Sequence, residues 1–364
     1  MYRILILFTI LIIYSCDNSN VNIPTDTLGD YNKAECLANI YDNIAIPAFE
    51  DLQSKIDLLQ ASSQAFVESP MDSVELLNEF RSDWFDAYCS WQYVEVFSLF
   101  GLGEDIDYGF KMNTYPTDIN RTNNIVNGIA QFNPAYIDNQ GFPALEYLIY
   151  GISNSDEEIL ISLNNSNART FITSLVSEMK NNSSNVLSWW NNNRSLIVND
   201  NTSTATSSLN LLINDFIYYY EKGFRTNKFG IPSGYFSSGL RFPNKTEGYY
   251  AKNISKSLAL HSQNSISNLF EGVSHNDNSQ IGESFYSYLS FLEESLLAED
   301  IAVKLDEVEL AIINLDNDFA TQVENNNDEM LITFSLIQSV VAKLKIEMMS
   351  AMGVGIDYVS GDGD

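Results

Sequence analysis

The chain has 364 residues, of which 48 are acidic and 19 are Lys or Arg, so its formal net charge is −29. Phosphate binding depends on basic side chains, so this balance argues against a nucleic-acid partner and against electrostatic adsorption to anionic lipid. Hydrophobic residues make up 45% of the chain. That content is enough for a large core and excludes a chain that is disordered throughout.

The first sixteen residues are typical of a bacterial export signal. Arg3 precedes a largely apolar run from Ile4 to Ile13, which is too short to span a bilayer but has the length of a signal-peptide core. The run leads to Ile-Tyr-Ser-Cys, which resembles a lipobox ending at Cys16. We therefore predict a signal peptide over 1–16, a lipid anchor at Cys16 and a flexible polar tether over 17–30. Plain secretion with cleavage elsewhere is the alternative.

The rest of the chain has apolar residues at helical spacing, and strand-like alternation is scarce. The expected helical segments are 34–66, 72–99, 168–190, 205–222, 249–270, 281–298, 299–316 and 328–350. Pro47 is expected to kink or break the first of them.

The predicted fold is all-α, with two helical-bundle domains packed together. Segments rich in Asn, Ser and Gly separate the expected helices at Asn191–Ser208 and Lys222–Gly248. The first of these segments is a candidate break between domains or helices. The expected N-terminal helical domain covers 31–200, and the C-terminal helical-bundle domain covers 201–364.

Two cysteines remain in the mature chain. An exported protein permits a disulfide between Cys36 and Cys89. Each lies in an apolar, helix-periodic segment, which favours buried free thiols over the disulfide.

One carboxylate lies on an aromatic helix stripe. Trp84, Tyr88, Trp91 and Glu95 follow one another at spacings that place them on one face of a helix. A charge on a face that packs in the core is costly unless it is paired, protonated or bound to a cation. Glu95 is therefore a candidate ligand-binding residue, unless the stripe ends at Trp91 and Glu95 reaches water.

A second carboxylate, Glu146, is the only acid in the apolar segment 141–151. Pro143 suits the first turn of a short helix. Glu146 is either a buried functional carboxylate or a structural residue that braces a neighbouring backbone, and spacing does not separate the two.

Several segments, in this order, resemble the imelysin-like family of bacterial lipoproteins and periplasmic proteins. They are Ile46–Phe49, Trp84–Gly101, Tyr115–Asp118, Gly141–Gly151, Lys228–Gly234 and the tail from Met352 to Asp364. The fourth resembles the family signature G-x-H-x-x-E, with the candidate signature residues Gly141, Phe142, Pro143, Glu146, Tyr147 and Gly151.

The resemblance implies two helical domains with the signature segment near their interface, an association with iron uptake, and a metallopeptidase label for some members. Pro143 stands where the signature has His, and a proline ring offers no nitrogen to a metal. The chain has no H-E-x-x-H, and neither His261 nor His275 begins an H-x-x-E, so both are expected to be ordinary surface or core residues. We therefore expect that the protein is not an enzyme.

Hard cations bind oxygen ligands and need no histidine. Glu95, Glu146 and Asp118 are the predicted members of an oxygen-only site for iron or another such cation. Glu247, in the second half, either faces Glu146 across the domain interface or caps the following helix, and capping is slightly favoured.

The favoured hypothesis is a non-enzymatic lipoprotein of the bacterial cell envelope, facing the periplasm or the cell exterior. Its partners would be the membrane, through Cys16, and components of iron or haem uptake, which it would meet through a cleft at the domain interface. The alternatives are a metallopeptidase with an atypical site and a structural, protein-interaction lipoprotein.

Overall fold

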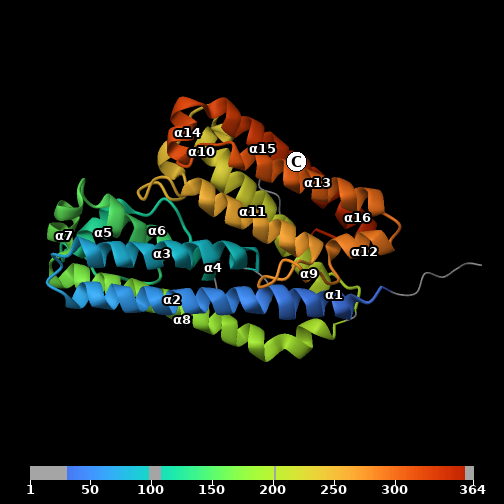
Figure 1. Ribbon diagram of the computed structural model, residues 1–364, viewed down its shortest axis with the longest axis horizontal. Coiled ribbons are helices and arrows are strands. Elements are labelled where there is room, and N and C mark those ends of the chain that lie inside the picture. The colour runs from blue at the N-terminus through green and yellow to red at the C-terminus, as the bar shows by residue number, and fades with distance from the viewer. Residues whose placement is uncertain (1–30, 98–107, 201, 357–364) are drawn as a thin grey trace, which may run out of the picture. The chain divides into compact units, whose positions relative to one another are not determined.

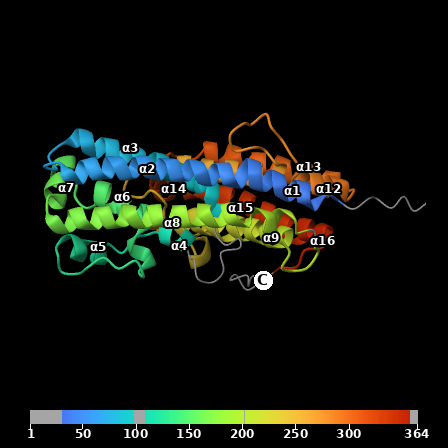
Figure 2. The same ribbon diagram turned by 90° about the horizontal axis from the view of Figure 1, so that it is seen from below.

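The computed structural model describes residues 31–97, 108–200 and 202–356, and there the chain is all-α, as predicted (Figures 1 and 2). An isolated bridge between Val273 and Ile281 is the only β-type pairing in these ranges. No helix in them is both long and apolar enough to cross a membrane. The predicted signal peptide 1–16 with Cys16, and the tether 17–30, lie outside the described residues.

The helical elements are α-helices, labelled α, and π-helical or 3-10-helical segments, labelled η. The elements up to residue 200 are α1 Lys33–Asn39, η1 Ile40–Ala45, α2 Ile46–Glu68, α3 Val74–Val94, η2 Glu95–Phe97, α4 Tyr108–Met112, α5 Ile119–Val126, η3 Ile137–Asn139, α6 Gly141–Glu146, η4 Tyr147–Gly151, α7 Asp156–Leu163 and α8 Ser166–Val198. The later elements are α9 Ser208–Tyr218, η5 Tyr219–Gly230, α10 Ile231–Ser233, η6 Tyr235–Ser237, η7 Pro243–Lys245, α11 Ser255–Glu271, α12 Phe285–Phe291, α13 Ser295–Ile313, α14 Phe319–Asn325, α15 Asn327–Ala342, η8 Lys343–Met348 and α16 Met349–Met352.

The long helix α2 packs against α3 and α8, and aromatic rings fill the space among them (Figure 1). Phe49 on α2 lies 5.5 Å from the ring of Trp190 on α8 and 6.1 Å from the ring of Phe97. The predicted stripe of Trp84, Tyr88 and Trp91 on α3 is fully buried. Large rings remove much apolar surface from water, which makes this the principal apolar core of the N-terminal half.

A second set of helices packs on the other side of α3. α11 contacts α3 and α13, and α13 contacts α15 (Figure 1). From Asn32 onward the described residues belong to one compact unit. The expected division into domains near residue 200 stays a prediction.

Pro47 does not break the first helical segment. The backbone stays helical from Lys33 to Glu68 because η1 changes to π-type hydrogen bonding just ahead of α2. Pro47 therefore falls in the first turn of α2, where its missing amide hydrogen is tolerated.

Three other boundaries differ from the expectation. Asn191–Asn193 lies inside α8, and the chain leaves the helix only after Val198. Trp190 is buried against α2, so tertiary packing outweighs the low helix propensity of asparagine. The expected linker from Lys222 begins as the π-helical η5. The expected helix 281–298 is interrupted after α12, where Glu293 adopts a positive φ of 65°.

Cys36 and Cys89 are not bridged to each other, in agreement with the arrangement favoured from the sequence.

Candidate functional site

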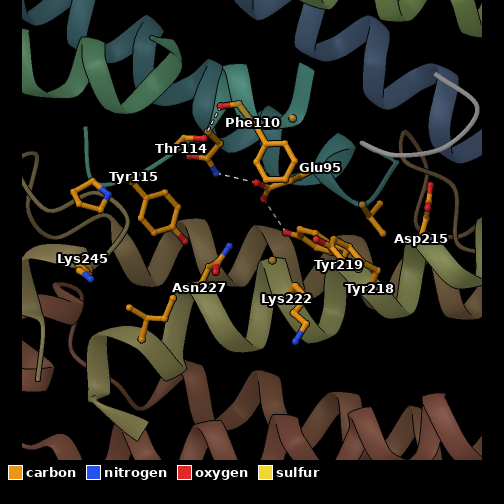
Figure 3. A pocket seen from close by; sticks show the side chains of 16 residues that line it. Glu95, Phe110, Thr114, Tyr115, Asp215, Tyr218, Tyr219, Lys222, Asn227 and Lys245 are labelled. Atoms are coloured by element: carbon orange, nitrogen blue, oxygen red, sulfur yellow. Dashed lines mark hydrogen bonds between the residues drawn. The ribbon is translucent and has the colours of Figure 1, made fainter. Parts of the chain in front are cut away.

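A pocket of about 300 Å³ lies between the two halves of the chain (Figure 3). One wall consists of η2 and the segment from Gly109 to Pro116, and the other of α9 and η5, with Lys245 at the edge. Its volume is at the lower end of the range for small-molecule sites. Glu95, a predicted site residue, lines it.

Glu95 lies where the aromatic stripe of α3 ends, and its side chain is 15% exposed. Its Oε1 accepts a hydrogen bond from Asn113 Nδ2 at 3.0 Å, and its Oε2 accepts one from the Tyr219 hydroxyl at 3.1 Å (Figure 3). Burial raises the pKa of Glu95, the nearby Lys228 ammonium lowers it, and the charge of Glu247 raises it again. The carboxylate is thus fixed in orientation but only partly neutralised.

Behind Glu95 is a buried ion pair between Lys228 and Glu247, which are 2% and 3% exposed. Lys228 Nζ also donates to Gln92 Oε1 at 2.8 Å. Glu247 Oε1 accepts from Gln92 Nε2 at 3.2 Å and from Asn113 Nδ2 at 2.8 Å. Asn113 therefore connects Glu95 with Glu247, and the two carboxyl groups share one buried ammonium.

The preference for Glu247 as a helix cap is wrong. α11 begins at Ser255, after the turn that follows Glu247, and Ile254 precedes it as the cap residue. The backbone oxygen of Glu247 accepts from Ser255 Oγ at 2.7 Å. The Glu247 side chain instead forms the buried ion pair with Lys228.

Glu146 lies at the end of α6 and is 3% exposed. Its Oε1 accepts from the backbone amides of Tyr250 at 2.6 Å and Ala251 at 2.9 Å. Burial, opposed by these two bonds, raises its pKa to about 7, and the charge of Glu247 contributes to the rise. Glu146 therefore braces the turn that follows Glu247, as the structural alternative predicted.

Close approaches hold both ends of the signature segment. Gly141 has a φ of 71°, and a Cβ there would lie 2.2 Å from the backbone oxygen of Met112. A Cβ on Gly151 would lie 2.3 Å from the ring of Tyr250. Pro143 lies in the first turn of α6, as predicted. The segment is thus wedged between α4, which leads into the pocket wall, and the turn that carries Glu247.

Phe142 and Tyr147 attach the same segment to its surroundings. The Phe142 ring stacks on Tyr88 at a centroid distance of 4.5 Å, and its backbone oxygen accepts from Trp84 Nε1 at 3.1 Å. The Tyr147 hydroxyl donates to Asn123 on α5 at 3.0 Å.

Asp118 is not part of the hydrogen-bond network that connects Glu95, Asn113, Glu247 and Lys228. It caps α5, accepting from the Arg121 amide at 3.0 Å. Within the described residues, no group of three or more His, Cys, Asp or Glu side chains is placed to hold a metal ion. Glu95, Glu146 and Asp118 therefore do not form the shared oxygen-ligand set that the sequence suggested.

Sequence reasoning missed four polar residues of the network: Gln92, Asn113, Tyr219 and Lys228. A signal existed for Gln92, because Tyr88, Gln92 and Glu95 share one face of a helix. Asn113, Tyr219 and Lys228 come from distant segments and carry no spacing that links them to Glu95.

The two histidines take no part in the pocket. His261 and His275 both pack edge-on against the ring of Tyr93, at centroid distances of 5.7 and 5.0 Å. Burial lowers the pKa of His275.

The Peptidase M75 family model, Imelysin, matches residues 45–346. The chain therefore belongs to the imelysin family, in agreement with the resemblance of its motifs.

Solved structures share the fold. An imelysin-like protein from Psychrobacter arcticum is 16% identical, with a TM-score of 0.70 over 90% of this chain and 97% of that one. A protein from Parabacteroides distasonis, provisionally named an iron-regulated protein A precursor, is 14% identical, with a TM-score of 0.70 over 88% of this chain and 95% of that one. Comparison with curated proteins finds no match.

Proposed function

We propose that this protein is a non-enzymatic lipoprotein of the bacterial cell envelope that binds a ligand in iron acquisition. The ligand site is the pocket between the two halves of the chain, and the Glu95 carboxylate is its principal polar contact. The observation that carries the proposal is that Glu95 lies at the wall of this pocket and is oriented by Asn113 and Tyr219.

Pre-organisation supports a binding role. A carboxylate already held by two donors loses little conformational freedom when a ligand arrives, which favours binding. The ion pair of Lys228 and Glu247 fixes Asn113 from behind. Such a supporting layer is typical of sites that must present one side chain in a fixed orientation.

The link to iron rests on the family and on the name of the Parabacteroides protein. The lipid anchor at Cys16, and the position in the periplasm or on the cell surface, rest on the order of charge, apolar run and cysteine in residues 1–16.

Pro143 favours a binder over a peptidase. Catalytic zinc is commonly held by three protein ligands that include histidine, and the proline replaces the only histidine of the signature.

The test is titration of the chain from Asp17 onward, which keeps the whole compact unit that starts at Asn32, with ferric citrate, haemin, Zn²⁺ and Ca²⁺. Calorimetry and elemental analysis would be applied to the wild type, to Glu95→Gln and to the control Asp118→Asn. We expect binding that is lost in Glu95→Gln and kept in Asp118→Asn. The absence of binding to all four would contradict a direct role in iron acquisition. A separate assay of casein hydrolysis tests the alternative, and hydrolysis that depends on zinc would favour the metallopeptidase.

A further inference from the structure

We infer that the pocket takes a small organic cation, whose ammonium or guanidinium group pairs with the Glu95 carboxylate. The inference rests on the proposed function of the pocket as the ligand site and adds the chemical class of the ligand.

The charged groups next to the pocket favour a cationic ligand. Glu95 and Glu247 share one buried ammonium, and Lys228 contacts Glu247 but is 3.9 Å from Glu95 Oε2. The Glu95 carboxyl group, which faces the pocket, therefore has one ammonium at 3.9 Å and two neutral hydrogen-bond donors as its partners. A partly buried charge is stabilised most by a partner of opposite sign, and a cationic ligand would supply that partner.

The second argument is the acceptor capacity of Glu95. An ionised carboxylate has about four lone-pair positions. Asn113 occupies one on Oε1 and Tyr219 occupies one on Oε2. Positions remain for the hydrogens of an ammonium or guanidinium group on the pocket side.

The third argument is the aromatic lining. Phe110, Tyr115 and Tyr219 lie around the approach to Glu95 (Figure 3). Aromatic faces attract cations by a cation–π interaction. Burial and the charges of Glu247 and Glu95 raise the pKa of Tyr115 well above its ordinary value, so its phenol stays neutral.

Two lysines also line the pocket, and each is engaged elsewhere. Lys222 Nζ is 3.5 Å from Glu221, and Lys245 Nζ lies over the ring of Phe242 at 4.6 Å. Asp215 adds a further acid to the wall near Tyr219. Glu95, which Asn113 and Tyr219 hold in a fixed orientation, is the acid of the pocket that we assign to the cation.

The experiment compares three probes of nearly the same size and different charge: 2-phenylethylamine, 2-phenylethanol and 3-phenylpropionate. Each would be titrated into the wild type, Glu95→Gln and Asp118→Asn, with binding followed by calorimetry and by ligand-observed NMR. Ferric citrate and haemin would be titrated into the same three proteins, and circular dichroism would confirm that all are folded.

We expect 2-phenylethylamine to bind more tightly than either of the other probes. Glu95→Gln should weaken it by roughly 10- to 100-fold, the usual worth of a hydrogen bond to a charged group, and Asp118→Asn should leave it unchanged. Equal binding of the three probes, or an amine affinity that Glu95→Gln does not alter, would overturn the inference. Glu95-dependent binding of ferric citrate or haemin without amine binding would overturn the inference and keep the proposed function. Absence of all binding would overturn both.

Discussion

Glu247 and Glu146 are two equally buried carboxylates that the same fold stabilises in different ways. Glu247 pairs with the buried Lys228 ammonium and accepts from two side-chain amides. Glu146 accepts from two backbone amides, and its pKa rises to about 7. Two carboxyl groups with the same burial are thus held by different partners, one by an ion pair and the other by backbone amides.

The difference assigns the two residues to different roles. Glu247 belongs to the buried ion pair with Lys228 that lies behind Glu95, and removing either partner of this pair should lower the free energy of unfolding. Glu146 holds the next turn of the same segment, where its charge can change near neutral pH.

The largest effect is expected from Lys228→Met, which leaves the Glu247 charge buried without its ammonium. Breaking a buried pair in this way usually lowers the free energy of unfolding by about 3–5 kcal/mol. Urea unfolding followed by circular dichroism would measure the loss. The double variant Lys228→Met with Glu247→Gln should recover much of it, because the fully buried Glu247 charge is then removed together with its partner. A double variant as unstable as the single one would contradict the role given to the pair.

Gly141→Ala should lower the free energy of unfolding by about 2–4 kcal/mol, because the new Cβ would meet the Met112 backbone oxygen and φ is positive. Gly353→Ala is the matched control: its φ is 66°, and no atom of the described residues lies within 4 Å of the added Cβ. The Gly353→Ala substitution should lower the free energy of unfolding by only about 1–2 kcal/mol, because only the strain of the positive φ remains. Equal losses in the two variants would show that the signature segment is not wedged against α4.

Glu146 should make stability fall as pH rises. Its pKa is about 7 in the folded protein, against an ordinary value of 4.5 that applies to the unfolded chain, so the unfolded chain loses the proton first. Below pH 4.5 both states hold the proton, and above pH 7 the folded state carries the full cost of the buried charge, about 3 kcal/mol at most. The free energy of unfolding of the wild type, relative to Glu146→Gln, should fall between pH 4.5 and 7. A difference that does not change with pH would contradict this.

Asp118→Ala should have the smallest effect on stability. Loss of a helix N-cap typically lowers the free energy of unfolding by about 1 kcal/mol. Asp118 caps α5 and does not contact the Lys228–Glu247 pair. Thermal unfolding would measure the change. A loss as large as that of Lys228→Met would mean that Asp118 belongs to the network after all.

Helical periodicity was sufficient to predict the all-α fold and the buried stripe of α3. It placed Glu95 at the end of that stripe and Glu146 in a buried helix. The partners of both carboxylates could not be predicted, because Asn113, Tyr219 and Lys228 come from segments whose separation in the chain says nothing about proximity. The π-helical η1 and η5 were also missed, since tertiary packing rather than periodicity decides the change of hydrogen-bond pattern.

We propose that the Glu95 carboxyl group is required for the role of this pocket in iron acquisition. The most direct test is growth of the native host under iron limitation, with Glu95→Gln or Asp118→Asn introduced at the chromosomal locus and protein levels checked by immunoblot. We expect the Glu95→Gln strain to grow as poorly as a deletion strain and the Asp118→Asn strain to grow like the wild type. Wild-type growth of Glu95→Gln, at equal protein level and with a defect in the deletion strain, would contradict it.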